Sequence, residues 1–243
     1  MSDSRTDDLA ARLAVVRREL DAAVTAAGRR SGDVELLVVT KFFPASDVCR
    51  LISLGESEFG ESREPEASRK IGELGEVVTN SGAVFDMIGT VQTKKAKTVA
   101  RWARSVHSVD RPKVVEHLDR AAGAALDEHV RTDLLGVFCQ VSLDGDPTRG
   151  GVLEAELPAL AEQVAGSSSL RLCGLMVIAP VQGSVREWMA KAAGLRAAFL
   201  SDHPQATQLS AGMSGDMAIA VEYGSTCVRV GTAIMGPRPI LSP

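Results

Sequence analysis

The stretch that decides the fold is Val34–Lys41, VELLVVTK, a run of apolar residues that ends on a single lysine. The run lacks the alternation of polar and apolar residues that marks a strand with one face in water. Such a run suits a strand buried on both faces, as in a parallel sheet covered by helices. The sequence therefore predicts an α/β protein whose first strand carries Lys41 at its carboxyl end.

The same strand–helix pattern repeats along the chain. An amphipathic helix is predicted over Thr6–Ala27, because apolar residues recur there at three- and four-residue steps. Seven further strands are predicted at Ser57–Gly60, Val84–Ile88, Ser105–Val109, Leu134–Val141, Leu170–Ile178, Gln208–Ser210 and Cys227–Val230. Helices are predicted between the strands at Ala45–Leu54, Ala67–Leu74, Lys94–Trp102, Pro112–Ala125, Pro158–Ala165, Ser184–Ser201 and Met213–Tyr223.

Eight strand–helix units are the number that closes a parallel barrel. We therefore expect a single (β/α)8 TIM barrel with an extra helix in front of it. A doubly wound open sheet is the alternative. No linker rich in proline and serine and no low-complexity tract divides the 243 residues, so we expect one domain over residues 1–243.

Composition and charge argue against several classes of protein. A net charge of −4 gives no electrostatic footprint for nucleic acid, and the basic stretch Thr93–Arg104 is interpreted as a solvated helix face. The amino terminus, MSDSRTDDLA, is acidic where a signal peptide is basic, and no apolar run is long enough to span a bilayer. The histidines and cysteines show no metal-ligand spacing. We expect a soluble cytoplasmic protein without a metal site.

Lys41 is the first candidate for chemistry, because working residues of a barrel lie at the carboxyl ends of its strands. The flanking Val38, Val39, Phe42 and Phe43 would partly desolvate the amine, lower its pKa and free it to attack a carbonyl carbon. Taken alone, the lysine is more often one that marks the exit of a strand into solvent.

A second candidate site lies near the carboxyl end of the chain. The segment Leu209–Met217, LSAGMSGDM, leads from a strand through Gly212 into a helix for which Ser214 is the predicted N-cap. The start of a helix offers free N–H groups and positive potential to a phosphate.

The last predicted strand adds to this site. It carries Arg229, with Gly231 and Thr232 at its carboxyl end. Barrels often bind phosphate after their seventh and eighth strands. Combined with Lys41 on the first strand, the pattern indicates a cofactor that bears both a phosphate and a carbonyl, and pyridoxal 5′-phosphate (PLP) is the obvious candidate.

Five motifs carry a family resemblance that spans residues 35 to 239. They are VVTKFFP, EFGESREPEASRK, MIGTVQTKKAK, GLMVIAP and LSAGMSGDMAIAVEYGSTCVRVGTAIMGPR. Together they resemble the pyridoxal phosphate homeostasis proteins, which are similar to the barrel domain of bacterial alanine racemase and eukaryotic-type ornithine decarboxylase. The resemblance implies a fold-type III PLP barrel.

The resemblance also implies roles for individual residues. Lys41 would hold PLP as a Schiff base. Ser214, Gly231 and Thr232 would hold the phosphate, with the Ser210 loop nearby.

Arg229 would face the pyridine nitrogen. An arginine does not give up a proton to the ring, so the ring would be a poorer electron sink than one paired with a carboxylate. The alternative for Arg229 is an ion pair inside the barrel with Glu222 or Asp216.

Two positions depart from the family pattern. Ser62 stands where the family usually has an asparagine that approaches the cofactor. Serine is shorter, so we expect this contact to be lost or replaced by water. Asp86 and Lys94 replace a histidine and an asparagine. Neither change touches the lysine, the arginine or the phosphate positions.

Racemisation on PLP needs two proton-transfer groups, one on each face of the substrate carbanion. In the racemases the second is a tyrosine from a β-rich domain that we expect this chain to lack. Tyr223 is expected to be a packing residue, and His107 could face the barrel mouth but is more often structural at such a position. No catalytic residue is therefore assigned.

The expected function is PLP binding in intracellular vitamin B6 homeostasis, by a monomer or a weak homodimer. The partners would be PLP and PLP-dependent apoenzymes, with neither nucleic acid nor membrane involved. The alternative is a slow PLP-dependent, racemase-like enzyme whose second base is His107 or comes from a partner chain. A lysine-dependent aldolase without cofactor is disfavoured by the predicted phosphate site.

Overall fold

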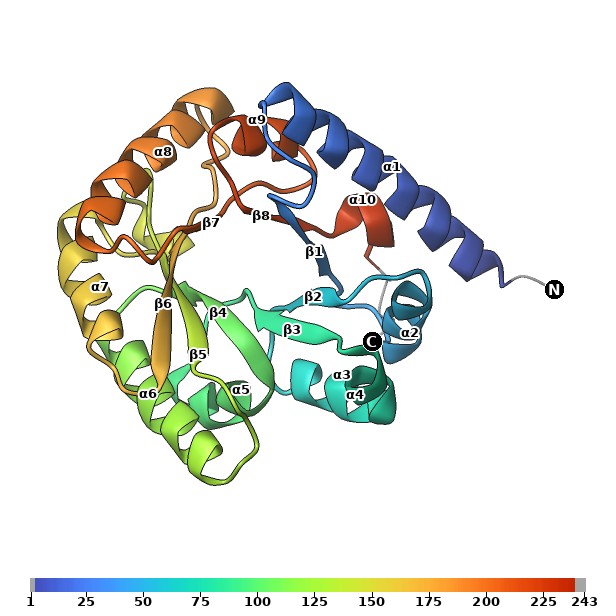
Figure 1. The fold of residues 1–243 in the computed structure, drawn as a ribbon, viewed down its shortest axis with the longest axis horizontal. Coiled ribbons are helices and arrows are strands. Elements are labelled where there is room, and N and C mark those ends of the chain that lie inside the picture. Colours follow the sequence, from blue (N-terminus) through green and yellow to red (C-terminus); the bar gives the residue numbers. More distant parts are fainter. Residues whose placement is uncertain (1–2, 239–243) are drawn as a thin grey trace.

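The computed structural model describes residues 3–238, which form a closed barrel of parallel strands in the order β1 to β8 (Figure 1). The strands are β1 (Glu35–Val39), β2 (Glu58–Glu61), β3 (Val84–Met87), β4 (Ala103–Val109), β5 (Leu135–Gln140), β6 (Leu170–Met176), β7 (Gln208–Ser210) and β8 (Cys227–Val230). Because β1 pairs with both β2 and β8, the predicted barrel is confirmed and the open sheet is wrong.

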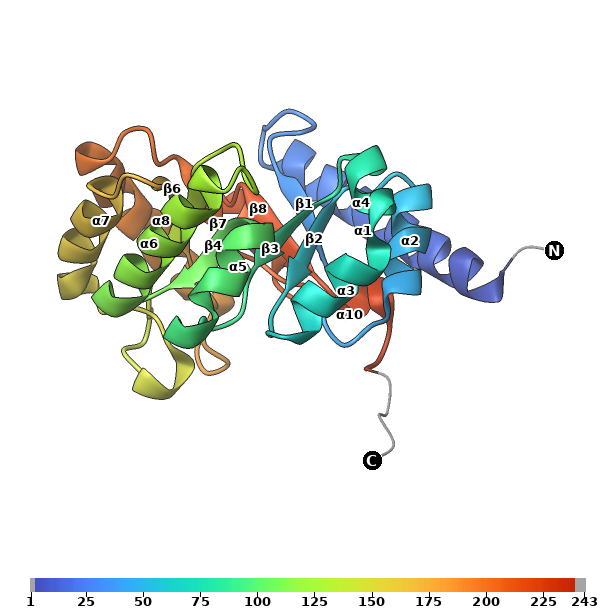
Figure 2. The same cartoon turned by 90° about the horizontal axis from the view of Figure 1, so that it is seen from below.

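Helices surround the barrel, as the two perpendicular views show (Figures 1 and 2). They are α1 (Ser4–Ala26), α2 (Ala45–Ser53), α3 (Glu66–Leu74), α4 (Glu76–Ser81), α5 (Ala96–Trp102), α6 (Pro112–Asp127), α7 (Leu157–Ala165), α8 (Val185–Asp202), α9 (Met217–Glu222) and α10 (Thr232–Met235). Short 3-10 turns lie at η1 (Thr93–Lys95), η2 (Pro147–Arg149) and η3 (Glu154–Glu156). No helix in the described part of the chain is both long and apolar enough to cross a membrane.

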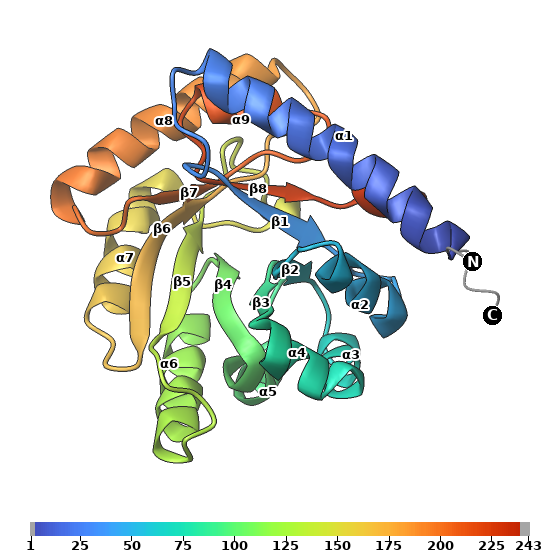
Figure 3. The ribbon, with the colours of Figure 1, turned by 45° about the vertical axis from the view of Figure 1, so that its right-hand side comes forward.

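The extra helix α1 covers the side of the barrel where the first and last strands meet. It packs against α2, α9 and α10, and Figure 3 shows it lying along that side. Its apolar stripe is buried as the periodicity predicts, through Leu9, Leu13, Val16, Leu20 and Val24. The helix is therefore part of the barrel's hydrophobic core and not an appendage.

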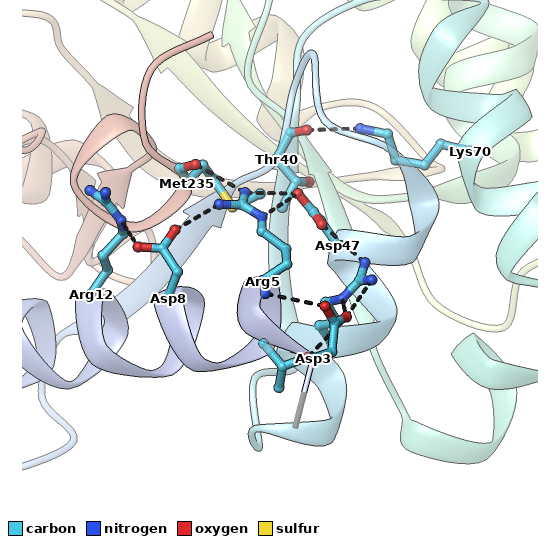
Figure 4. Close-up of polar contacts among 10 residues, drawn as sticks. Asp3, Arg5, Asp8, Arg12, Thr40, Asp47, Lys70 and Met235 are labelled. Carbon is cyan, nitrogen blue, oxygen red and sulfur yellow. Dashed lines mark hydrogen bonds and ion pairs between the residues drawn. The ribbon is translucent and has the colours of Figure 1, made fainter. Parts of the chain in front are cut away.

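Arg5 ties the start of α1 to the elements that follow β1 and β8 (Figure 4). Its Nη2 donates to Asp47 Oδ2 of α2 at 2.8 Å and to the carbonyl of Met235 in α10 at 3.0 Å. Its Nη1 donates to Asp8 Oδ2 at 2.9 Å, and its guanidinium lies 5.7 Å from the ring centre of Phe43. One side chain thus joins three helices and the loop after β1.

Replacing Arg5 should therefore destabilise the fold more than replacing a neighbouring surface arginine. Arg5→Ala should lower the free energy of unfolding by roughly 1–3 kcal/mol, because the buried carboxylate of Asp47 loses charged hydrogen bonds. Arg12→Ala should cost less than about 1 kcal/mol, because the side chains of Arg12 and its partner Asp8 are 42% and 41% exposed, so that water screens the pair. Urea denaturation measures both values, and equal losses would contradict the role given to Arg5.

Candidate functional site

A cavity of about 360 Å³ opens at the carboxyl ends of β1 and β8. Five of the seven residues assigned from the sequence line it, namely Lys41, Ser214, Arg229, Gly231 and Thr232. These residues come from opposite ends of the chain and meet because β1 pairs with β8. The volume lies within the range of about 300–1,000 Å³ typical of small-molecule sites.

Lys41 lies in the turn after β1 and is half-buried. Burial lowers the pKa of its amine, and the nearby cations of Arg238, Arg63 and Arg229 lower it further. The expected desolvated lysine is thus present, and cations that the sequence did not connect with it add to the effect. An amine with a lowered pKa is more often neutral near pH 7 and is a better nucleophile.

Phe42, which follows the lysine, has an unusual environment. Its φ of 72° lies in the left-handed region, which bulky side chains rarely adopt. The guanidinium groups of Arg63 and Arg238 lie 5.1 Å and 4.6 Å from its ring centre. Neither arginine forms an ion pair within residues 3–238, so both leave positive charge beside Lys41. Strain of this kind persists only where the surroundings hold it.

A buried hydrogen-bond network supports the backbone just before Lys41. Lys70 Nζ donates to the carbonyl of Thr40 at 2.8 Å, shown in Figure 4, and to Glu61 Oε1 at 2.6 Å. The Thr40 hydroxyl donates to the same Glu61 oxygen at 2.7 Å. Sequence reasoning missed this group, although Glu61 and Lys70 both lie in the motif EFGESREPEASRK.

The predicted N-cap at Ser214 is wrong. Helix α9 begins at Met217 with Asp216 as its N-cap, and Ser214 lies in the exposed turn before it. Asp216 Oδ1 accepts a hydrogen bond from the backbone N–H of Met213 at 2.5 Å, which closes this turn ahead of the helix. Ser214 nevertheless lines the cavity, as part of a turn and not of a helix end.

Gly231 lets the end of β8 lie close against β1. A Cβ atom at this position would stand 3.3 Å from the Cβ of Val39 and 3.4 Å from its carbonyl oxygen. Gly231 is also the N-cap of α10, and Thr232, the first residue of that helix, is exposed at the cavity. The sequence predicted the residues but not the short helix that they begin.

Arg229 is buried and reaches the cavity from the barrel interior. Its Nη1 donates to Ser210 Oγ at 2.5 Å and its Nη2 donates to the carbonyl of Val177 at 2.9 Å. Burial lowers the pKa of its guanidinium. The alternative of an ion pair with Glu222 or Asp216 is wrong, because Arg229 forms no ion pair within the described range 3–238.

The remaining two assigned residues lie outside this cavity. Ser210 is fully buried beneath Arg229, inside the barrel. Ser62 lines a neighbouring cavity of about 350 Å³ that shares Lys41, Phe42 and Phe43 with the first.

His107 does not face the barrel mouth. Its side chain is 1% exposed, its ring centre lies 4.1 Å from that of Phe138, and both of its nitrogens have partners. Burial lowers the pKa of its imidazole, although Asp86 acts against this shift. Tyr223 is partly buried against the core at the end of α9, as predicted.

Arg104 corrects the interpretation of the basic stretch Thr93–Arg104. It lies in β4 and not on a helix, and it binds Asp86 and Glu35 at the amino end of the barrel. No group of three or more histidine, cysteine or carboxylate side chains within residues 3–238 is arranged to hold a metal ion.

Comparisons with known proteins identify the family of this chain. The model of the alanine racemase N-terminal domain matches residues 14–239. The pyridoxal phosphate homeostasis protein of Mycobacterium tuberculosis (strain ATCC 25618 / H37Rv) is 46% identical, with 98% of this chain and 96% of that protein covered. The protein of the same name in Escherichia coli (strain K12) is 37% identical, with 96% and 97% covered.

A solved structure is also similar to this chain over nearly its full length. PipY of Synechococcus elongatus, determined with PLP bound, has a TM-score of 0.80 at 30% identity, with 94% of this chain and 100% of that chain covered. The chain therefore belongs to the pyridoxal phosphate homeostasis proteins, within the family defined by the N-terminal domain of alanine racemase.

Proposed function

We propose that this chain binds PLP in the cytoplasm and serves vitamin B6 homeostasis, with the cofactor held as a Schiff base on Lys41. The observation that carries the proposal is the single cavity in which a lysine amine of lowered pKa meets the buried Arg229 and the Gly231–Thr232 turn. The names of the relatives, and the PLP bound to PipY, support it.

The residues that line the cavity fit this cofactor. The amine of Lys41 would add to the aldehyde carbon, and one water molecule would leave. Ser214, Gly231 and Thr232 would hold the phosphate, and Arg229 would face the ring nitrogen. When bound, PLP supplies an aldehyde and an electron-withdrawing ring, which Arg229 would leave unprotonated.

The two outlying serines take different proposed roles. Ser62 would approach the cofactor from the neighbouring cavity, where it is shorter than the asparagine usual in the family. Ser210 would act through its hydrogen bond with Arg229 instead of holding the phosphate directly.

A racemase-like activity is the alternative, and the position of His107 argues against it. Both ring nitrogens of His107 are occupied within the barrel, and Tyr223 does not line the cavity. Because neither His107 nor Tyr223 is placed beside Lys41 as a second base, we favour storage and delivery of PLP to PLP-dependent apoenzymes over catalysis. The chain would act as one domain, alone or as a weak homodimer.

An exchange assay separates these two functions. The PLP-loaded protein is incubated with a panel of amino acids in D₂O, and loss of the α-proton signal is followed by NMR. Exchange no faster than with free PLP supports a binding protein. Exchange at an enzymatic rate would overturn that proposal.

The covalent bond to Lys41 predicts a visible absorption band after addition of PLP, and borohydride should fix the cofactor to the peptide that contains Lys41. Lys41→Ala should abolish both, whereas Lys113→Ala, at an exposed position of α6, should change neither. Absorption spectroscopy and peptide mapping provide the readouts. Label on Lys70 in place of Lys41 would refute the assignment.

The cations around Phe42 predict a pH-dependent rate of PLP capture. Arg63→Gln and Arg238→Gln remove charges that lower the pKa of Lys41, so that pKa should rise and less neutral amine should remain at neutral pH. Capture should slow by roughly two- to tenfold near pH 7.5 and return to the wild-type rate above about pH 10.4. Stopped-flow absorbance measures the rate.

Arg69→Gln, at an exposed position of α3, is the matched control and should leave the rate unchanged. A slower rate that persists above about pH 10.4 would show that the arginines attract the phosphate and do not act on the amine.

A further inference from the structure

Five buried polar residues form a continuous hydrogen-bonded chain across the barrel interior. Arg229 Nη1 lies 2.5 Å from Ser210 Oγ, which lies 2.9 Å from His107 Nδ1. His107 Nε2 lies 2.9 Å from Ser105 Oγ, which donates to Asp86 Oδ1 at 2.8 Å. Each of the five residues is at most 5% exposed. The chain therefore runs from the cavity beside Lys41 into the barrel, where Ser105 and His107 line a second cavity of about 370 Å³ near the amino ends of the strands.

The ionisation state of Asp86, at the end of this hydrogen-bonded chain opposite to Arg229, sets the direction of every hydrogen bond in it. Burial opposes ionisation of Asp86, but the nearby imidazole of His107 and the hydrogen bonds from Arg104 outweigh it and hold the pKa of that carboxyl far below its usual range. An ionised carboxylate only accepts, so Ser105 gives its hydrogen to Asp86 and accepts from His107. His107 is then protonated at Nε2.

The protonation of the imidazole sets the remaining hydrogen bonds, from His107 to the cavity. A neutral imidazole with its proton on Nε2 accepts at Nδ1, so the Ser210 hydroxyl donates to His107. The lone pairs of the Ser210 hydroxyl are then left to accept a hydrogen bond from Arg229. With a neutral histidine, this set of directions satisfies all four links and also gives the hydrogen of Ser210 an acceptor.

The surroundings of His107 favour that neutral form. Burial lowers its pKa and Arg229 on β8 adds to the shift, while Asp86 on β3 and Glu35 on β1 oppose it. A charged imidazole would also donate to Ser210. The hydroxyl would then receive two donors, and its own hydrogen would lose its acceptor.

We propose that His107 is a positioning residue that orients the guanidinium of Arg229 toward the cavity by fixing the hydroxyl of Ser210. Apart from Ser210, the guanidinium is anchored within the described chain only at the carbonyl of Val177. The expected effect on PLP affinity rests on the function proposed above. The directions of the hydrogen bonds and the neutral state of His107 do not.

A double-mutant cycle tests the link to the ligand. His107→Phe and Ser210→Ala should each weaken PLP binding about tenfold and shift the visible absorption of bound PLP, because each loosens one charged hydrogen bond. The double variant should be no worse than either single variant, since His107 acts only through Ser210. Losses that multiply would overturn the proposal.

Two further variants separate positioning from general stability. His107→Asn keeps a polar group close to the position of Nδ1 and should recover most of the lost affinity; a folded Asn variant that binds as poorly as His107→Phe would count against the proposal. Ser108→Ala removes the next buried hydroxyl of β4, which donates to the carbonyl of Gly89, and should leave PLP affinity unchanged.

NMR of the cofactor-free protein tests the chain itself. The ¹⁵N shifts of His107 should report the neutral Nε2–H tautomer at pH 7 and down to below about pH 6.5, the usual histidine pKa. The guanidinium protons of Arg229 should exchange faster with water in both single variants. An Nδ1–H tautomer or a charged ring at pH 7 would refute the hydrogen-bond directions given above. A wild-type protein that passes these NMR tests but does not bind PLP would refute only the proposed function.

Discussion

The pairing of β1 with β8 is the constraint on which the candidate site depends. Leu37 lies opposite Arg229 and Val38 opposite Val230, so the two ends of the chain are joined in one fixed register. Because parallel strands end at the same rim, Lys41 and the Gly231 turn must share that rim. A slip of one residue would turn Arg229 out of the barrel, since side chains alternate along a strand.

Two polar contacts hold the loop that carries Lys41 from either side. Arg5 of α1 contacts Phe43 and the helix that follows it, while Lys70 donates to the carbonyl of Thr40 and Glu61 accepts from the Thr40 hydroxyl. A buried ion pair adds little net stability, because desolvation offsets its attraction. Its directional hydrogen bonds do restrict where the loop can lie. Arg5 thus acts on the loop from outside both cavities, whereas Glu61 and Lys70 act from the neighbouring cavity that Lys41 and Ser62 also line.

The fold was predictable because strands of a parallel barrel are buried on both faces and show as apolar runs. Helices α4 and α10 were missed because so few residues carry no readable periodicity, and the N-cap was misplaced because the side-chain contact of Asp216 forms only in the folded turn. The sequence predicted the residues that line the cavity at the carboxyl ends of the strands, but not the hydrogen-bonded chain in the barrel interior. Its one sequence signal is Ser105 and His107, polar at alternate positions of β4; Asp86 and Ser210 join them only through the closed sheet.

The interior of a (β/α)8 barrel is usually filled by branched apolar side chains. Here a polar chain replaces them, and in a medium of low dielectric constant such a chain is strong when complete and destabilising when broken. Its charges are separated, because the carboxylate of Asp86 lies at the far end and is already paired with Arg104. Within residues 3–238, the guanidinium of Arg229 forms hydrogen bonds only with a hydroxyl and a carbonyl group. Its positive charge is therefore fixed in place at the cavity without being neutralised there.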